Sequence, residues 1–293
     1  MKRNIKFQGN PLTLVGRAIG VGRPAADFRV VSQELKELGL GDFRGKTKVI
    51  TSFPSLDTPV CDLQVREFNK RAAGFSSDVA VIGISKDLPF AQKRFCQDHG
   101  VKNATIVSDY RYSSFGINYG LLIKELNLLA RAVIIVDKSD AIRYIQIVEE
   151  LTSPPDYEAA LKALEDSGRA GAAAAQGPLL RCRPCKGGVA ALSKDKIEEL
   201  LAERRGWELL ENKKLAKDFK FRDFAEAKYF LDIVSAIAEE QEHHPILTIN
   251  YNKLRITLTT HAAGGLSDND FIMAGIIDEL GAGDKEGLSH YGC

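Results

Sequence analysis

Residues 54–61 read Pro-Ser-Leu-Asp-Thr-Pro-Val-Cys and separate an apolar, strand-like run from a helix-like run that begins at residue 62. Thr58 is a suitable N-cap residue and Pro59 suits the first helical position, so Cys61 is predicted in the first helical turn. The free N–H groups and the positive dipole end of that turn favour a thiolate over a thiol. We therefore expect Cys61 to be a nucleophile that meets water, and not a small buried core residue.

The composition is that of an ordinary globular protein of about two domains, with 293 residues, 44% apolar and 27% charged. A net charge of +1 gives no indication of binding to nucleic acid or to an acidic membrane. No stretch resembles a transmembrane span or a signal peptide. Five cysteines in a chain without a leader indicate a reducing compartment, so we expect a cytoplasmic protein.

Residues 1–166 alternate strand and helix signals, which predicts an α/β domain with a central sheet. The expected strands are 48–53, 79–84, 132–136 and 141–148, and a last helix is expected at 156–165. Residues 167–188 form an Ala/Gly-rich predicted linker. The linker contains Cys182 and Cys185 at C-x-x-C spacing; no role is favoured for them, and a flexible accessory dithiol is the alternative.

Residues 189–282 predict an α+β domain whose antiparallel four-stranded sheet is covered on one face by helices. A capping box at Asp223 opens a long helix with one apolar face. That face is expected to hold Phe224, Ala227, Phe230, Val234 and Ile237. The other expected helices are 193–205 and 267–280, the strands 207–211, 215–221, 246–250 and 254–260, and a flexible tail 283–293.

Cys96 lies in the last turn of a predicted helix that ends at Gly100. The dipole disfavours a thiolate there, so Cys61 is predicted to attack and Cys96 to resolve. A lowered thiol pKa alone raises the thiolate fraction by a factor of about 25, so a fast reaction also needs groups that stabilise the transition state. Thr58 and an arginine near the pocket are expected to supply them.

Residues 1–165 resemble the thiol peroxidases, which are atypical two-cysteine peroxiredoxins with a thioredoxin-like fold. Pro54, Thr58 and Cys61 match the motif P-x-x-x-T-x-x-C. Further matching segments are 57–62, 87–96 and 128–133. By this resemblance the peroxidatic cysteine is Cys61, the resolving cysteine is Cys96 and the active-site arginine is Arg131.

The resemblance implies a cycle for hydrogen peroxide and organic hydroperoxides. Cys61 becomes a sulfenic acid, Cys96 condenses with it to an intramolecular disulfide, and thioredoxin, as external reductant, reduces that disulfide. A disulfide needs Cα atoms within about 7 Å, and the two cysteines lie on different helices. We therefore predict that both helices unwind locally during turnover.

Three of the five histidines, His243, His244 and His261, are predicted to meet at the open end of a hairpin. A tight turn at 251–252 would place His243 opposite Thr260. Metal binding is one alternative and satisfied surface histidines are another. Adjacent His243 and His244 point to opposite sides of an extended backbone, so no metal is expected and acid–base chemistry near neutral pH is favoured.

The same region resembles pterin-4a-carbinolamine dehydratases. The matching segments are 206–207, 219–224, 242–245, 251–252, 256–261 and 265–270. The family's catalytic histidines fall on His243, His244 and His261, and its later acidic residue on Asp270. The resemblance implies that a 4a-hydroxytetrahydropterin substrate loses water to give quinonoid dihydropterin, with no bound cofactor or metal.

The sequence therefore predicts a bifunctional fusion enzyme that forms a homodimer or larger homo-oligomer. Tetrahydropterins release peroxide when they react with oxygen, so one chain could clear both by-products of an aromatic hydroxylation. The alternative is a peroxidase whose second domain is a non-catalytic dimerisation or protein-binding module.

Overall fold

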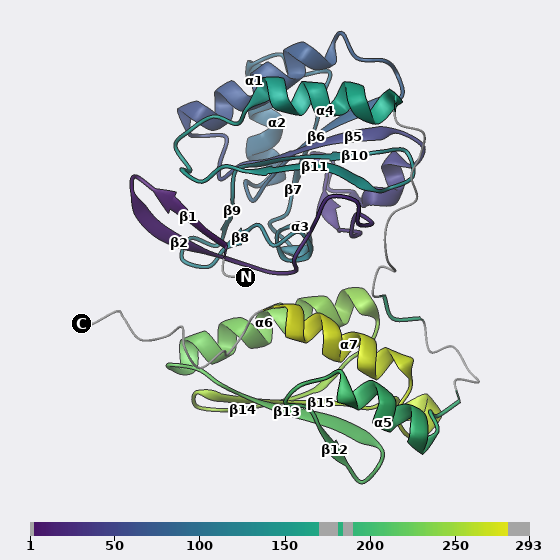
Figure 1. Ribbon diagram of the computed structural model, residues 1–293. Coiled ribbons are helices and arrows are strands. Elements are labelled where there is room, and N and C mark those ends of the chain that lie inside the picture. Colours follow the sequence, from purple (N-terminus) through teal and green to yellow (C-terminus); the bar gives the residue numbers. More distant parts are fainter. Residues whose placement is uncertain (1–2, 170–180, 184–189, 281–293) are drawn as a thin grey trace. The chain divides into compact units, whose positions relative to one another are not determined.

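The computed structural model describes residues 3–169, 181–183 and 190–280 (Figure 1). The chain divides into two compact units, Met1–Leu179 and Leu180–Cys293. Each unit is described by itself below. Cys185, Cys293, the tail 283–293 and most of the predicted linker 167–188 lie outside the described residues.

The first unit is built on a seven-stranded sheet in the order β11-β10-β5-β6-β7-β3-β4. The strands are β3 Val30–Val31, β4 Glu37–Leu38, β5 Thr47–Ser52, β6 Val79–Ser85, β7 Thr105–Ser108, β10 Ala132–Val136 and β11 Ile142–Ile147. Strands β5, β6 and β7 are parallel, because helices connect them, whereas β10 runs antiparallel to β5. The predicted α/β thioredoxin-like fold is confirmed.

The two faces of this sheet carry different layers. Helices α1 Pro59–Ala72, α2 Pro89–Asp98 and α4 Tyr157–Arg169 lie on one face (Figure 1). Because side chains alternate along a strand, Val49 packs with α1 residue Phe68, and its neighbour Ile50 belongs to the core of the opposite face. That opposite face is covered by η1 Leu40–Phe43, α3 Ser114–Asn118 and a small sheet of β1 Arg3–Phe7, β2 Asn10–Val15, β8 Leu122–Ile123 and β9 Leu128–Leu129.

The β1–β2 hairpin turns at Gln8 and Gly9, both with positive φ. The carboxylate of Glu150 accepts hydrogen bonds from the N–H groups of Gln8 and Gly9, at 3.0 and 3.1 Å. These bonds, led by that of Gly9 and aided by the Thr152 hydroxyl, lower the pKa of Glu150 to about 2. The backbone of Lys6 also pairs with residues 149 and 151. The hairpin is therefore attached to the segment that precedes α4.

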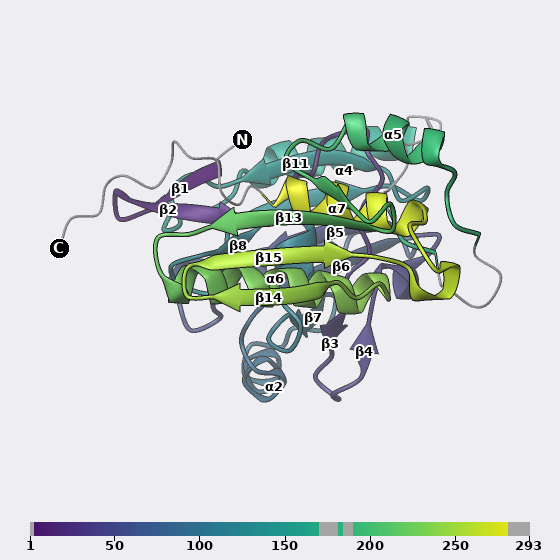
Figure 2. The same cartoon turned by 90° about the horizontal axis from the view of Figure 1, so that it is seen from below.

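The second unit has a four-stranded antiparallel sheet in the order β12-β13-β15-β14, with α6 and α7 across one face (Figures 1 and 2). Its elements are α5 Lys194–Ala202, β12 Glu208–Leu210, β13 Lys214–Lys220, α6 Phe224–Gln241, β14 Ile246–Asn250, β15 Lys253–Leu258, η2 His261–Ala263 and α7 Asp268–Glu279. Ile246 pairs with Thr257, which is the predicted hairpin register. The predicted α+β fold is confirmed.

One predicted core position of α6 is wrong. Ala227, Phe230, Val234 and Ile237 are buried, but Phe224 is 48% exposed. Phe224 is the first residue of α6, directly after the N-cap Asp223, and the buried stripe begins only at Ala227. The Asp223 side chain accepts a hydrogen bond from Glu226 N, so the predicted helix start is correct.

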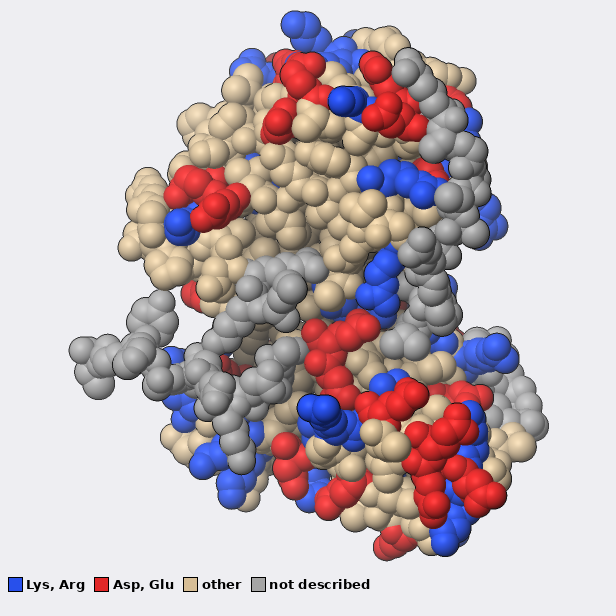
Figure 3. Space-filling view, viewed as in Figure 1, with Lys and Arg blue, Asp and Glu red and all other residues tan. Residues whose placement is uncertain are grey.

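Among the described residues, no helix is both long and apolar enough to span a bilayer. On the face drawn in Figure 3, basic and acidic side chains lie beside one another on both units, and the acidic ones gather on part of the second unit.

Candidate active sites

Cys61 lies in the first turn of α1, as predicted, with Thr58 as an extended N-cap residue and Pro59 at the first helical position. Its side chain is 0% exposed and packs in an apolar cluster with Phe53 and Val65. The expectation that Cys61 meets water is therefore wrong. Thr58 and Pro59 at the helix start are exposed, but the Cys61 side chain turns inward and packs with Phe53 at the end of β5 and Leu56 of the following loop.

Two hydrogen-bond donors face the buried sulfur. Thr58 Oγ1 lies 2.8 Å and Arg131 Nη2 lies 3.3 Å from Cys61 Sγ. The same threonine oxygen lies 3.1 Å from the Ser55 carbonyl, and one hydroxyl proton can serve only one of these acceptors at a time. The Thr58 hydroxyl can therefore turn away from sulfur without losing a partner.

Arg131 is only 1% exposed and is held on three sides. Its Nε and Nη2 donate to the Leu151 carbonyl at 3.2 and 2.9 Å, and its Nη1 donates to Gln64 Oε1. Gln64, 0% exposed, donates in turn to the Thr51 hydroxyl and the Ser52 carbonyl of β5. Gln64 was not predicted from the sequence; its signal is its place three residues after Cys61, on the same helix face.

A second group that the sequence did not reveal is the carboxylate of Asp87. It accepts hydrogen bonds from the Ser55 hydroxyl at 2.7 Å and from Leu56 N at 2.8 Å. It also accepts from the hydroxyl of Ser85, at the end of β6. The loop that carries buried Pro54 and exposed Thr58 is thereby tied to the segment that leads into α2.

Cys96 lies in the last turn of α2, which is capped by His99 and followed by Gly100 with φ 63°, as predicted. It belongs to the same apolar cluster as Cys61, and both thiols are free. Burial raises the pKa of the Cys96 thiol, although Gln33 Nε2, 3.2 Å from its sulfur, partly offsets that effect. The two buried sulfurs have different hydrogen-bond partners, Thr58 and Arg131 at Cys61 and Gln33 at Cys96.

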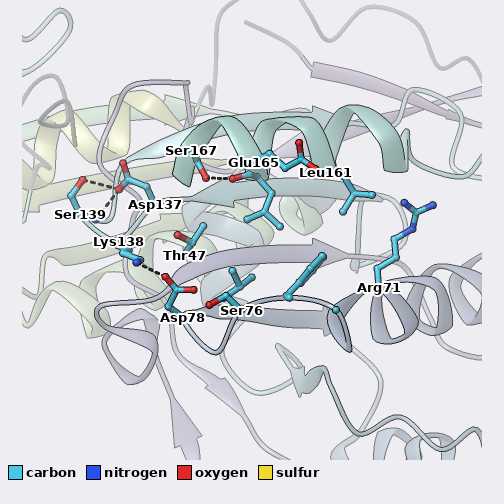
Figure 4. Close-up of a pocket in the computed structure, with 14 residues that line it drawn as sticks. Thr47, Arg71, Ser76, Asp78, Asp137, Lys138, Ser139, Leu161, Glu165 and Ser167 are labelled. Carbon is cyan, nitrogen blue, oxygen red and sulfur yellow. Dashed lines mark hydrogen bonds and ion pairs between the residues drawn. The ribbon is translucent and has the colours of Figure 1, made fainter. Parts of the chain in front are cut away.

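A cavity of about 690 Å³ in the first unit lies away from this site (Figure 4). It is lined by apolar Phe75 and Leu164 and by the ion-paired Asp78 and Lys138. Thr47, which also lines it, opens β5, whereas the loop to Cys61 follows the other end of that strand. The cavity is therefore separate from the cysteine site.

The second unit buries one imidazole against a carboxylate. His243 Nε2 lies 2.8 Å from Asp270 Oδ1, and the two residues are 5% and 0% exposed. The other carboxylate oxygen accepts from Thr260 Oγ1 at 2.7 Å and from Ser267 N at 2.8 Å. A carboxylate only accepts hydrogen bonds, so in a bond between an ionised Asp270 and the imidazole the proton is carried by His243 Nε2.

The other two histidines are exposed. His244 Nε2 lies 2.9 Å from Glu239 Oε2 at the surface, so adjacent His243 and His244 point in different directions, as predicted. His261 opens η2. The meeting of the three imidazoles at the open end of the hairpin stays a prediction. Among the residues described, no cluster of three His, Cys, Asp or Glu side chains is suited to hold a metal ion.

Cys182 does not behave as part of a flexible dithiol. Its side chain is 6% exposed, and its N–H donates to Gln241 Oε1 at 2.9 Å. The described residues 181–183 thus contact the second unit, and the alternative of a flexible accessory dithiol is wrong for Cys182.

Comparisons with known proteins match both units. The Redoxin family model matches residues 20–161, and the model described as pterin 4 alpha carbinolamine dehydratase matches residues 190–280. The thiol peroxidase of Halalkalibacterium halodurans is 46% identical over 160 residues, which cover 55% of this chain and 96% of that protein. The thiol peroxidase of Bacillus subtilis is 46% identical over 159 residues, with coverage of 54% and 95%. A peroxiredoxin-like protein from Aquifex aeolicus is 43% identical in its crystal structure, with a TM-score of 0.53 and coverage of 56% and 98%.

Proposed function

The chain belongs to the thiol peroxidase family through its first unit, and we propose on that basis that Cys61 is its peroxidatic and Cys96 its resolving cysteine. The observation that carries the proposal is the buried sulfur of Cys61 with two donors, Thr58 and Arg131, facing it. Donors placed this way stabilise negative charge on sulfur and on the oxygens of a bound peroxide.

The reaction proceeds in two steps on the protein. The Cys61 thiolate attacks the terminal oxygen of the peroxide, the O–O bond breaks, and the leaving oxygen takes a proton to give water or an alcohol. Cys61 is left as a sulfenic acid. The Cys96 sulfur then attacks the Cys61 sulfur, the S–S bond forms and water leaves.

The disulfide is reduced by an external dithiol, for which we propose thioredoxin. Two electrons and two protons pass from that dithiol to Cys61 and Cys96. No group in the first unit substitutes for it, because the third free cysteine described, Cys182, belongs to the second unit.

Peroxide consumption by purified chain with thioredoxin and its reductase tests this proposal. Cys61→Ser should abolish turnover, and Cys96→Ser should consume one peroxide per site and then stop. Peroxide turnover that persists in Cys61→Ser would overturn the assignment. Wild type that turns over with a small dithiol but not with thioredoxin would overturn only the reductant.

For the second unit, which matches the dehydratase family over residues 190–280, we propose dehydration of a 4a-hydroxytetrahydropterin. The observation that favours it is the His243–Asp270 pair. Asp270 holds the imidazole with Nδ1 available as a base, while exposed His244 or His261 can protonate the departing hydroxyl. The N5–H bond and the bond between C4a and the hydroxyl oxygen break, and the products are quinonoid dihydropterin and water.

A non-catalytic dimerisation or protein-binding module is the competing function for this unit. Assay of the purified chain with a 4a-hydroxypterin separates the two. Dehydration that is lost in folded His261→Ala supports the enzyme, whereas a wild-type chain without dehydratase activity supports the module.

We also propose a cytoplasmic homo-oligomer, a dimer or larger. The free thiols of Cys61 and Cys96 fit a reducing compartment. Sedimentation of the full chain tests the assembly, and a monomer at micromolar concentration would contradict it.

A further inference from the structure

Residues 181–183, which we call the strap, lie outside the segment that matches the dehydratase family yet are bonded to it. Cys182 N donates to Gln241 Oε1 at 2.9 Å. Arg183 forms a two-way pair with the Asn269 amide: its N–H donates to Oδ1 at 2.9 Å and its carbonyl accepts from Nδ2 at 2.7 Å. The Cys182 thiol also lies 3.6 Å from the Asn269 carbonyl oxygen.

The two anchors of the strap flank the buried imidazole–carboxylate pair. Gln241 is the last residue of α6, and His243 follows it after Glu242, which has a left-handed backbone with φ 50°. Asn269 lies in the first turn of α7 and directly precedes Asp270. The strap therefore links the end of α6, two residues before His243, to the start of α7, one residue before Asp270.

Burial shows that these contacts are part of the folded unit and not a surface association. Cys182, Gln241 and Asn269 are 6%, 7% and 5% exposed. Buried amide groups need hydrogen-bond partners, and the strap backbone supplies them to both side chains. His243 follows the end of α6 and Asp270 lies in the first turn of α7, so contacts that restrain both helix ends help to keep the pair in a fixed geometry.

We propose that the strap positions His243 and Asp270, so that the functional second unit begins at residue 181 and not at residue 190 where the family match starts. The proposal rests on the proposed dehydratase function only for its effect on activity. The strap touches neither the imidazole nor the carboxylate in any described hydrogen bond, so its residues act through Gln241 and Asn269.

The test uses full-length Asn269→Ala, which removes both bonds to Arg183, and Gln241→Ala, which removes the bond to Cys182. Each should lower dehydratase kcat, by up to about 10²-fold, with little change in KM and with a shifted pH profile. Gln241→Glu keeps an oxygen acceptor for Cys182 N–H and should restore most of the activity. Peroxidase turnover by the same chain should not change.

Two readouts do not depend on dehydratase activity. The NMR signal of the His243 Nε2 proton, bonded to Asp270 in wild type, should broaden or shift in both alanine variants. Labelling of Cys182 by a thiol reagent, resolved by peptide mapping, should be slow in wild type and fast when an anchor is lost. The matched control is Asn250→Ala, at an exposed asparagine in β14, and it should leave both readouts as in wild type.

The outcomes are distinct. Fast labelling of Cys182 with an unchanged His243 signal and unchanged kcat would show a strap that detaches without consequence, and would overturn the proposal. Slow labelling in both alanine variants would show that Gln241 and Asn269 do not anchor the strap, and would also overturn it. Wild type without dehydratase activity but with a His243 signal that depends on the anchors would refute the proposed function and keep the positioning role.

Discussion

Arg131 is a buried cation whose hydrogen-bond partners in the described part of the chain are a thiol, an amide oxygen and a backbone carbonyl. None of these is a carboxylate. A buried guanidinium in such surroundings stabilises charge that develops on sulfur or oxygen, because no carboxylate already satisfies it. Hydrogen bonds to Gln64 and Leu151 keep the planar guanidinium group of Arg131 in one orientation.

Replacement of that guanidinium should slow the attack on peroxide. Arg131→Met keeps the apolar stem and removes the charge, and the second-order rate of Cys61 oxidation should fall by about 10² or more. Stopped-flow measurement with hydrogen peroxide checks this. Arg44→Met, at an exposed arginine, is the control, and an equal rate in both variants would contradict the role assigned to Arg131.

We expect the resolving step proposed for Cys96 to depend on pH, because its thiol is buried. Its pKa is raised by burial, so the folded form holds its proton in a range where an unfolded cysteine, with a pKa of about 8.5, loses it. Stability from this group is present below about pH 8.5 and is lost as pH rises through the raised pKa. Disulfide formation after a peroxide pulse should therefore accelerate above about pH 8.5, because α2 then opens more easily.

Mass spectrometry of quenched samples measures this rate across pH. Oxidation of Cys61 to sulfenic acid in Cys96→Ser serves as the reference for effects on the first step. A resolving rate that falls between about pH 8 and 10 would contradict the expected acceleration.

Asp270 contacts His243 through a single carboxylate oxygen. Replacement of the carboxylate by an amide should therefore impair proton transfer at His243. Asp270→Asn can present an N–H to Nε2 and thereby favour the wrong imidazole tautomer. Dehydratase kcat should fall by about 10²-fold or more, with a displaced pH profile. The neighbouring Asp268→Asn, exposed on α7, should have little effect, and equal losses in both variants would indicate a general effect of charge on the helix start.

At the scale of the elements, hydrogen bonds to Asp87 connect the loop between β5 and α1 with the segment that leads into α2. Ser85 accepts a hydrogen bond from Gln92 of α2, which is 0% exposed, and donates to Asp87. The Cys61 loop and the Cys96 helix are therefore held by one continuous hydrogen-bond network. The disulfide proposed between the two free thiols would need their Cα atoms within about 7 Å, and this network would resist any opening that this requires.

Loss of the network should favour the open form. Asp87→Ala should increase amide hydrogen exchange in 55–61 and 89–98, lower the rate of Cys61 oxidation and speed the resolving step relative to it. Hydrogen exchange with mass spectrometry, with quench-flow on the same samples, gives both quantities. Asp57→Ala is the control, because Asp57 is in the same loop but exposed. Unchanged hydrogen exchange in Asp87→Ala would show that the network does not restrain the two segments.

Local signals in the sequence predicted these elements well, and contacts distant in sequence explain what they missed. The cap at Thr58, the helix end at Gly100 and the β14–β15 register follow from neighbouring residues and are all present. The burial of Cys61 and the links made by Gln64 and Asp87 depend on strands that come together only in the fold. Cys182 was assigned to a linker because its partners lie 59 and 87 residues further along the chain.

At the scale of the whole molecule, one chain joins a thiol peroxidase unit to a unit that matches the pterin 4 alpha carbinolamine dehydratase model. The described hydrogen-bond partners of each candidate site come from its own unit. A benefit from linkage would then come from shared location, since the hydroxylation that makes a carbinolamine also releases peroxide when the pterin is oxidised.

Linkage can be tested without dividing the chain. A mixture of Cys61→Ser and His261→Ala full-length chains supplies both activities on separate molecules, and wild type at equal site concentration supplies them together. In a coupled hydroxylase assay, wild type should protect the hydroxylase for longer than the mixture. Equal protection would remove shared location as the reason for the fusion.

The complete burial of Cys61 also decides which oxidants and electrophiles compete for it. We therefore expect a peroxide of two heavy atoms to reach the sulfur more readily than glutathione disulfide or a bulky alkylating reagent, which would need a larger opening of the structure around α1. Selection by size would spare the thiol from unwanted adducts, and the trapping rate of a bulky thiol reagent would report how often that opening occurs.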